Sequence, residues 1–329
     1  MRQSFVGMIV ALLLLPCLAA AEEASSVADT TDLVNMTPAD LFLRASSSAL
    51  QFEAMRQPSR RLLIKNHEES VPYLVTQLDT DDARERIALE DILVKIGSPA
   101  VGPLIESLAR EIERVDTTRG ARLAAGILGR IGDSEAVAPL VDARGQPDWK
   151  VRGAVAEALG RIGDAEAVPG LVELLQDANE VVRKSAAVGL ARVAEEEDGA
   201  DALDEPGVEA LAAALADPYY SVRWSAARAL AAIGKPAVAR LIELAAAAEE
   251  PAGILAIHAL GEIGEEDAVR PLRDVLGSAS WAAAAYAAEA LGKIGLSGSD
   301  RKVLQRMLGN GAHPFVAHKI EVALEATGP

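Results

Sequence analysis

An Ile-Gly pair ends an apolar run six times in this chain, and the pair recurs at nearly constant spacing. The pairs are Ile96-Gly97, Ile131-Gly132, Ile162-Gly163, Ile233-Gly234, Ile263-Gly264 and Ile294-Gly295. Successive glycines lie 35, 31, 71, 30 and 31 residues apart, and the long interval holds a degenerate seventh copy at Arg192-Val193-Ala194. A period this regular indicates a stack of similar units, each of which contacts only its neighbours.

The residues before each glycine predict helices. Half of the chain is hydrophobic but only 3% is aromatic, so Ala, Leu, Val and Ile provide the apolar mass, and Ala has the highest helix propensity. In the clearest repeat, apolar residues from Val151 to Ile162 recur every three or four positions, as in an amphipathic helix. Gly163 then ends the helix, and Asp164 is placed to cap the next one, predicted over residues 165–176. We therefore expect an all-α fold of antiparallel helix pairs.

The period also predicts how the chain is divided. We expect a right-handed α-solenoid of about seven two-helix repeats over residues 67–298, with helical caps at 38–66 and 299–329. An acidic insertion at residues 195–205 interrupts the repeat. Its carboxylates lack the spacing of a calcium loop, so we interpret it as a solvated loop.

The repeat motif resembles that of a known superfamily. Asp-x-x-x-Val-Arg is followed by Ala-Leu-Gly-x-Ile-Gly-Asp and then by Ala-Val-x-x-Leu, over residues 81–296. This pattern is similar to the HEAT repeats, specifically the short-period HEAT-like repeats of phycobilisome lyases. The resemblance implies that the second helix of each pair lines a concave surface. Because the superfamily includes scaffolds, lyases and a hydroxylase, it indicates the fold more strongly than the function.

The first 21 residues have the composition of a secretory signal. Arg2 precedes an apolar run from Phe5 to Leu15, and Ala19-Ala20-Ala21 forms a small-residue cleavage site. The apolar run is short for a membrane anchor. Cys17 stands in a sequence that loosely resembles a lipobox, but Pro16 fits that pattern poorly. We therefore favour export to the periplasm or the medium over lipoprotein anchoring, with residues 22–37 as a disordered tether.

Charge narrows the classes of partner. The chain has 49 acidic and 32 basic residues, a net charge of −17, and removal of residues 1–21 would leave −18 and no cysteine. Strong acidity argues against nucleic-acid binding and docking on anionic lipid. A mature chain without cysteine has no disulfides, thiol catalysis or thiolate metal sites. We expect no stable membrane insertion after signal cleavage.

An arginine recurs at one equivalent position of several repeats. The arginine eleven residues before the glycine position is present as Arg86, Arg152, Arg183 and Arg223. These side chains either form a row of anion-binding groups or pair with acidic residues of their own or neighbouring turns. We favour the second, structural interpretation, because partly buried charges are usually paired.

A second basic column lies two residues before the glycine position, at Lys95, Arg130, Arg161 and Arg192. By the resemblance, these residues form a basic ridge along the concave surface. Asp91 and Glu157, one turn earlier, are placed to pair with Lys95 and Arg161. The ridge is our candidate site for an acidic segment of a partner, and the alternative is an ordinary solvated helix face.

Aromatic residues provide a secondary candidate. Tyr219 and Tyr220 lie close to Trp224, whereas Trp149 and Trp281 occupy the position of Tyr220 in other repeats. Aromatic residues at that position usually cover the turn between helices. We retain only the cluster of Tyr219, Tyr220 and Trp224 as a candidate binding site.

Known catalytic motifs are missing from the sequence. It contains neither a His-Glu-x-x-His nor a Gly-x-Ser-x-Gly motif. Hydroxylases of this superfamily bind iron through repeated His-Glu pairs, and this chain has one such pair, His67-Glu68. We predict no catalytic residue, metal or cofactor. The predicted function is a non-enzymatic scaffold or adaptor that binds a protein or peptide, including an acidic one; the alternative is a lyase-like or chaperone-like protein that handles a tetrapyrrole-type cofactor or a client protein.

Overall fold

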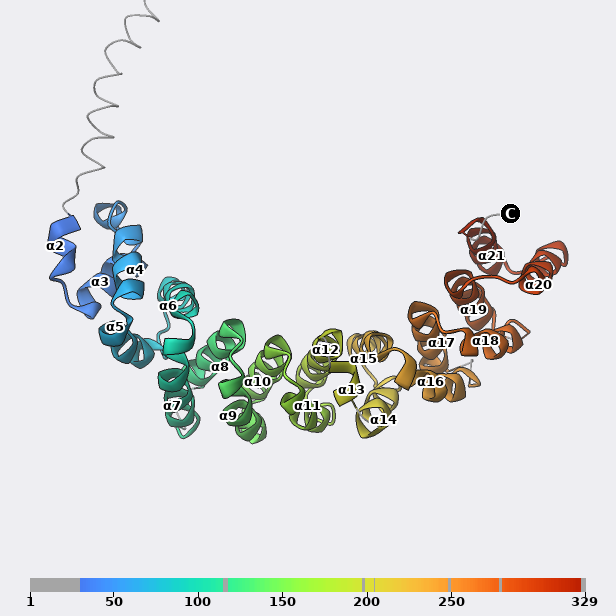
Figure 1. The fold of residues 1–329 in the computed structure, drawn as a ribbon, viewed down its shortest axis with the longest axis horizontal. Coiled ribbons are helices and arrows are strands. Elements are labelled where there is room, and N and C mark those ends of the chain that lie inside the picture. The colour runs from blue at the N-terminus through green and yellow to red at the C-terminus, as the bar shows by residue number, and fades with distance from the viewer. Residues whose placement is uncertain are drawn as a thin grey trace, which may run out of the picture. The chain divides into compact units, whose positions relative to one another are not determined.

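The computed structural model describes residues 30–114, 118–196, 199–203, 205–247, 250–277 and 280–326. The predicted signal peptide and residues 22–29 of the predicted tether lie outside these ranges. All regular structure in the described residues is helical (Figure 1). The chain divides into two compact units, Met1–Ile127 and Leu128–Pro329, which are described separately as the N-terminal and C-terminal units.

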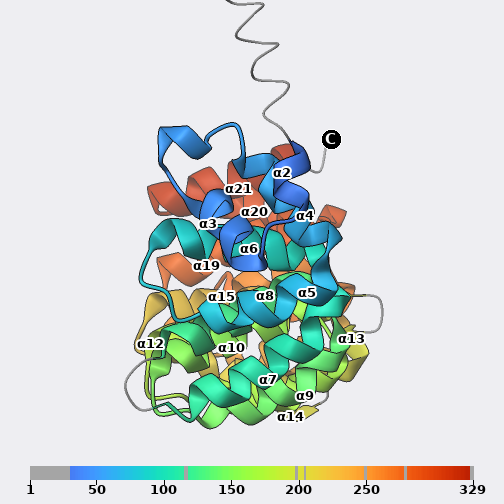
Figure 2. The same ribbon diagram turned by 90° about the vertical axis from the view of Figure 1, so that its left-hand side faces the viewer.

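The N-terminal unit is helical from Thr30 onward. Its helices are α2 (Thr30–Val34), α3 (Pro38–Ser46), α4 (Arg56–Lys65), α5 (His67–Leu74), α6 (Ala83–Ile96), α7 (Val101–Ile112) and most of α8 (Arg119–Ile131). Helices α2 and α3 both pack on α4 (Figure 2). Residues 30–34, which belong to the predicted tether, form α2, and Leu33 of this helix is buried.

The C-terminal unit consists of helix pairs in two layers. One layer, called the second-helix layer here, contains α10 (Trp149–Ile162), α12 (Glu180–Glu195), α15 (Tyr220–Ile233), α17 (Pro251–Ile263), α19 (Trp281–Ile294) and α21 (Pro314–Ala326). Each of these helices packs on the next (Figure 1). The other layer contains the first helices α9 (Val137–Asp142), α11 (Val168–Leu174), α14 (Glu205–Ala214), α16 (Val238–Ala245), α18 (Val269–Val275) and α20 (Gly298–Gly309). The all-α solenoid fold is therefore confirmed.

The glycine after each isoleucine ends its helix as predicted. Gly163 has a φ of 76°, and its amide donates to the carbonyl oxygen of Leu159 over 3.2 Å. The glycines of the other five Ile-Gly pairs also have positive φ. In the degenerate copy, where Ala194 replaces the glycine, α12 continues to Glu195. A left-handed residue is thus what ends these helices, because it costs glycine little strain.

Small residues let the second helices approach closely. A Cβ atom added at Gly160 of α10 would lie 2.3 Å from the Cα atom of Gly189 on α12. At Gly261 of α17 the added atom would lie 2.7 Å from the Cα atom of Ala290 on α19. These contacts explain why glycine and alanine, rather than aromatic residues, stand where the second helices meet.

The segments between the second helices are more divided than predicted. The expected helix over residues 165–176 is a 3₁₀ turn, η6 (Ala165–Ala167), followed by α11. Asp164 caps the turn, since its side chain accepts a hydrogen bond from the Glu166 amide. The acidic insertion also contains a short helix, α13 (Gly199–Ala202).

No single helix among the described residues is long and apolar enough to cross a membrane. The segments Ala83–Ile96 and Ser98–Ile112 reach the required length and composition together, but they meet at a bend of 117°.

Candidate functional site

The repeat arginines bind the turns between helices. In α10, Nε of Arg152 lies 2.5 Å from one carboxylate oxygen of Asp177, and Nη2 lies 2.9 Å from the other. Arg183 makes the same paired contact with Asp217, at 2.7 and 3.1 Å. Each arginine thereby ties its helix to the turn of the next repeat, which is the structural arrangement we favoured.

Backbone carbonyl groups complete these arginine sites. Arg152 and Arg183 also donate to turn carbonyls, and the Nη1 group of Arg223 donates to the carbonyl oxygens of Asp217 and Pro218 at 2.7 and 3.0 Å. In the N-terminal unit, Arg86 donates to the carbonyl oxygen of Asp81 at 2.9 Å. Burial alone would raise the pKa of Asp177, but hydrogen bonds from Arg152 and the Asn179 amide outweigh it and lower that pKa.

The predicted basic ridge is not a uniform row of cations. Lys95 belongs to the N-terminal unit and binds Asp91 over 2.7 Å, and Arg161 binds Glu157 over 2.7 Å. Arg130 is exposed and Arg192 is half-buried. The helical pairing expected from the sequence is therefore present at Lys95 and Arg161.

Aromatic rings form a row across three consecutive second helices. Tyr220 and Trp224 of α15 are stacked with ring centroids 6.2 Å apart, and Trp224 stacks on His258 of α17 at 5.0 Å. Tyr286 of α19 meets His258 edge-on at 6.3 Å. We call these four residues the aromatic row. Tyr220 is 61% exposed and Trp224 is 36% exposed, so the row is open to a ligand.

Two features refine the aromatic candidate. Tyr219 is not part of the row; its ring lies 5.8 Å from the guanidinium carbon of Arg183. Burial lowers the pKa of His258 below its usual value, more than the nearby carboxylate of Glu262 raises it. The His258 ring is therefore neutral at pH 7. A neutral ring favours stacking on Trp224.

His258 and Tyr286 were not among the candidate residues predicted from the sequence. Trp224 lies ten residues before its glycine, His258 six and Tyr286 nine. Aligning the repeats compares residues at the same distance from the glycine. These three rings stand at different distances from it, so the alignment does not bring them together. Only the offset between neighbouring helices, which comes from the structure, brings them together.

An ion-pair network borders the aromatic row on the α19 side. Nζ of Lys293 lies 2.6 Å from Glu262 and 3.2 Å from Glu289, and Lys319 of α21 lies 2.5 Å from Glu289. Burial would raise the pKa of Glu289, but hydrogen bonds from Lys319 and Lys293 lower it overall. The charges at this end of the layer are therefore balanced.

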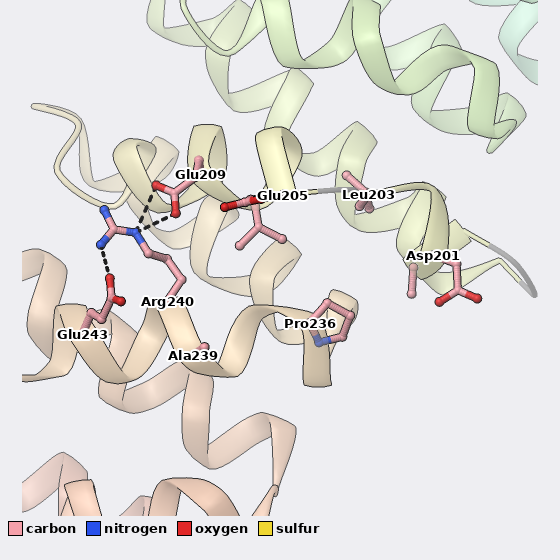
Figure 3. A pocket seen from close by; sticks show the side chains of 10 residues that line it. Asp201, Leu203, Glu205, Glu209, Pro236, Ala239, Arg240 and Glu243 are labelled. Atoms are coloured by element: carbon pink, nitrogen blue, oxygen red, sulfur yellow. Dashed lines mark hydrogen bonds and ion pairs between the residues drawn. The ribbon is translucent and has the colours of Figure 1, made fainter.

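A shallow pocket lies on the opposite, first-helix side of the C-terminal unit. Asp201 and Glu205 of the acidic insertion line it together with residues of α14 and α16 (Figure 3). Arg240 bridges Glu209 and Glu243 there, at 3.0 and 2.7 Å. Among the residues that the structure describes, no group of three His, Cys, Asp or Glu side chains is placed to hold a metal ion.

Comparison with known proteins agrees with this architecture. The family model described as HEAT repeats matches residues 116–191 and 238–325. The chain belongs to the HEAT-repeat superfamily. The model of the PBS lyase HEAT-like repeat matches residues 222–247, which include Trp224. These HEAT repeats build a helical scaffold of the kind that typically binds protein partners.

No curated protein sequence matches this HEAT-repeat protein. Among solved structures, an engineered protein is 21% identical, with 91% of this chain and 98% of that chain covered and a TM-score of 0.44. The complex of CpcE and CpcF of phycocyanin lyase from Nostoc sp. PCC7120 is 24% identical over 50% of this chain and 97% of that chain, with a TM-score of 0.41. Human deoxyhypusine hydroxylase in complex with glycerol is 23% identical over 79% of this chain and 96% of that chain, with a TM-score of 0.35.

Proposed function

We propose that this HEAT-repeat protein is an exported, non-enzymatic scaffold that binds a protein partner on its second-helix layer. The aromatic row carries the proposal. Tyr and Trp bury large areas at a small cost in conformational entropy, and they dominate the energy of many protein interfaces. Helices α15 and α19 present Tyr220, Trp224 and Tyr286, and the His258 ring of α17 joins them in one row of the C-terminal unit.

The repeat itself does not require these rings. The position of Trp224 is occupied by Gly153 in α10 and by Lys184 in α12, and both helices pack in the same layer. Alanine, leucine and valine supply the buried core in every repeat. An exposed Trp224 stacked between Tyr220 and His258 therefore adds nothing that the neighbouring repeats need, which favours a role in binding.

The test is comparative capture of partners from cell-envelope extract by three full-length baits: the unmodified protein, a Tyr220→Ala/Trp224→Ala variant and a Trp149→Ala control. Trp149 is 38% exposed on α10 and lies outside the row, so it matches the exposure of Trp224. We expect at least one protein to be retained by the first and third baits and lost by the second. Equal capture by all three baits, measured by quantitative mass spectrometry, would refute the proposal.

The alternative function is a lyase-like or chaperone-like role toward a flat cofactor. The match of the PBS lyase HEAT-like repeat to residues 222–247 favours it, because Trp224 lies in that segment. Native mass spectrometry and absorption spectra of the purified protein separate the two functions. A chromophore that is bound by the unmodified protein and lost from the Tyr220→Ala/Trp224→Ala variant would replace the scaffold with this alternative.

A further inference from the structure

We infer that the partner segment is acidic, and that Lys184, Arg192 and Arg228 bind its carboxylates beside the aromatic row. This inference rests on the proposed function, because it names the chemistry of the partner at the same surface. It moves the centre of the predicted basic ridge from its four original residues to the junction of α12 and α15.

The three cations differ from those cations of this layer that are bound by carboxylates. Lys293 and Lys319 are bound by Glu262 and Glu289, and Arg161 is bound by Glu157. In contrast, within the described part of the chain, no hydrogen bond or ion pair occupies the charged groups of Lys184, Arg192 or Arg228. The layer thus has ion-paired cations at α17–α21 and cations without an ion pair at α12–α15.

Helical spacing places these cations next to the rings. Lys184 and Arg192 are eight residues apart and share one face of α12, which packs directly on α15. Tyr220, Trp224 and Arg228 follow at four-residue intervals on α15 and share one face there. Because Trp224 faces His258 across the layer, Arg228 is placed one turn further along the same surface.

The net charge of the protein makes this cluster informative. With 49 acidic residues in the chain, compensating carboxylates are abundant, yet none reaches these cations among the described residues. Clustered like charges repel one another, and an anionic ligand removes that repulsion. Guanidinium groups bind carboxylates through paired, charge-assisted hydrogen bonds. The adjacent rings suit an apolar anchor residue, so the surface fits a segment that carries carboxylates next to a large apolar side chain.

The test is selection of random displayed peptides on the immobilised full-length protein. Peptides of about 12 residues are long enough to span two helices, at roughly 3.3 Å per residue. Enriched peptides are synthesised with a fluorophore, and their affinities are measured by anisotropy. One variant is Lys184→Glu/Arg192→Glu/Arg228→Glu, and a second is Trp224→Ala. The control is Lys235→Glu/Arg270→Glu/Lys302→Glu, which changes the net charge of the protein by the same amount but at exposed positions outside the proposed surface. Circular dichroism confirms equal helicity.

We expect the enriched peptides to combine several carboxylates with an apolar residue. The cation variant should weaken their binding at least about tenfold, the control should leave it within about twofold, and higher salt should weaken it further. Neutral or basic enriched peptides, or equal loss in the control, would overturn the inference. Binding that needs Trp224 but not the three cations would overturn the acidic preference and leave the proposed function intact. Binding that needs neither, or no enrichment at all, would overturn both.

Discussion

Two glycines of helix α10 differ sharply in what surrounds them. A Cβ atom at Gly160 would lie 2.3 Å from the Cα atom of Gly189, whereas a Cβ atom at Gly153 would meet only Val182 Cγ2, at 3.9 Å. We predict that Gly160→Ala destabilises the protein by about 1–3 kcal/mol, because α12 must move away. Gly153→Ala should instead be neutral or stabilise by up to about 1 kcal/mol, since alanine favours the helix.

Urea denaturation followed by circular dichroism measures both glycine variants on the same helix. Each introduces one methyl group into α10, so Gly153→Ala controls for the change in helix propensity. Equal midpoints for the two variants would show that the close contact between α10 and α12 does not limit the stability of the stack.

The Arg152–Asp177 pair makes the folding stability of the protein depend on pH. The pKa of Asp177 is lowered in the folded chain, so its stabilising effect is present above the unfolded pKa of about 3.9 and is lost as the pH falls through the folded value. We predict that Asp177→Asn costs about 1.5–3 kcal/mol at pH 7, where a charged hydrogen-bond partner is removed. The stability that Asp177→Asn loses relative to the unmodified protein should become smaller below about pH 4.

Urea midpoints measured between neutral pH and about pH 3 test the Asp177 prediction in the range where the carboxylate titrates. Asp164→Asn is the matched control, because the Asp164 side chain caps a 3₁₀ turn by accepting a hydrogen bond from the Glu166 amide, and asparagine is also a good cap. A midpoint difference for Asp177→Asn that stays constant with pH would contradict the prediction.

Single residues were predictable where one chemical rule decides their role. Gly163 had to end a helix, and Arg152 had to find partners, because a left-handed backbone and a half-buried charge each leave few options. His258 and Tyr286 belong to no such rule. Their role comes from the contacts between their rings on neighbouring helices. These contacts depend on how far α17 and α19 are offset along their axes.

At the scale of helices, the C-terminal cap offers a matched pair of positions on α21. Ile320 is fully buried, and Val322 is 45% exposed on the same helix. We predict that Ile320→Ala costs about 2–4 kcal/mol because it leaves a cavity, and that Val322→Ala changes stability by less than about 1 kcal/mol. Terminal repeats keep a solenoid stable by covering its last apolar face, so loosening α21 should also expose α19.

Hydrogen exchange measured by mass spectrometry locates the effect of the α21 variants. With Ile320→Ala, we expect faster exchange in α21 and α19 and unchanged exchange in α10, because repeats couple mainly to their neighbours. Uniformly faster exchange through the C-terminal unit would show that it unfolds as one cooperative body, contrary to the prediction.

Helices were predictable to the residue where the repeat is regular, and less so where it is not. The second helices end at Ile96, Ile131, Ile162, Ile233, Ile263 and Ile294 because a glycine follows each one. The first helices α9, α11, α16 and α18 follow 3₁₀ turns, as at Ala165–Ala167, which hydrophobic periodicity does not distinguish from an α-helix. In the acidic insertion, composition indicated solvation but gave no sign of α13.

At the scale of the whole molecule, net charge excluded partners more effectively than it identified one. A charge of −17 argued against nucleic acid from the sequence alone. The surface that we propose for the partner has the opposite sign locally, because acidic residues neutralise some cations of the second-helix layer and leave Lys184, Arg192 and Arg228 uncompensated. Pairing of charges between helices is a property of the assembled stack, so total composition could not reveal it.

Export is the remaining whole-molecule proposal, and Cys17 allows a decisive test. If residues 1–21 are a simple signal peptide, mass spectrometry of the exported protein should find Glu22 at its N-terminus and no thiol, since Cys17 is the one cysteine in the sequence. Leu13→Arg should block export by breaking the apolar run, whereas Cys17→Ser should change neither export nor fractionation. A lipoprotein would behave differently: its N-terminus would be a lipid-modified Cys17, and Cys17→Ser would release it from the membrane fraction. That outcome would keep the binding surface as proposed but place it on a membrane-anchored protein.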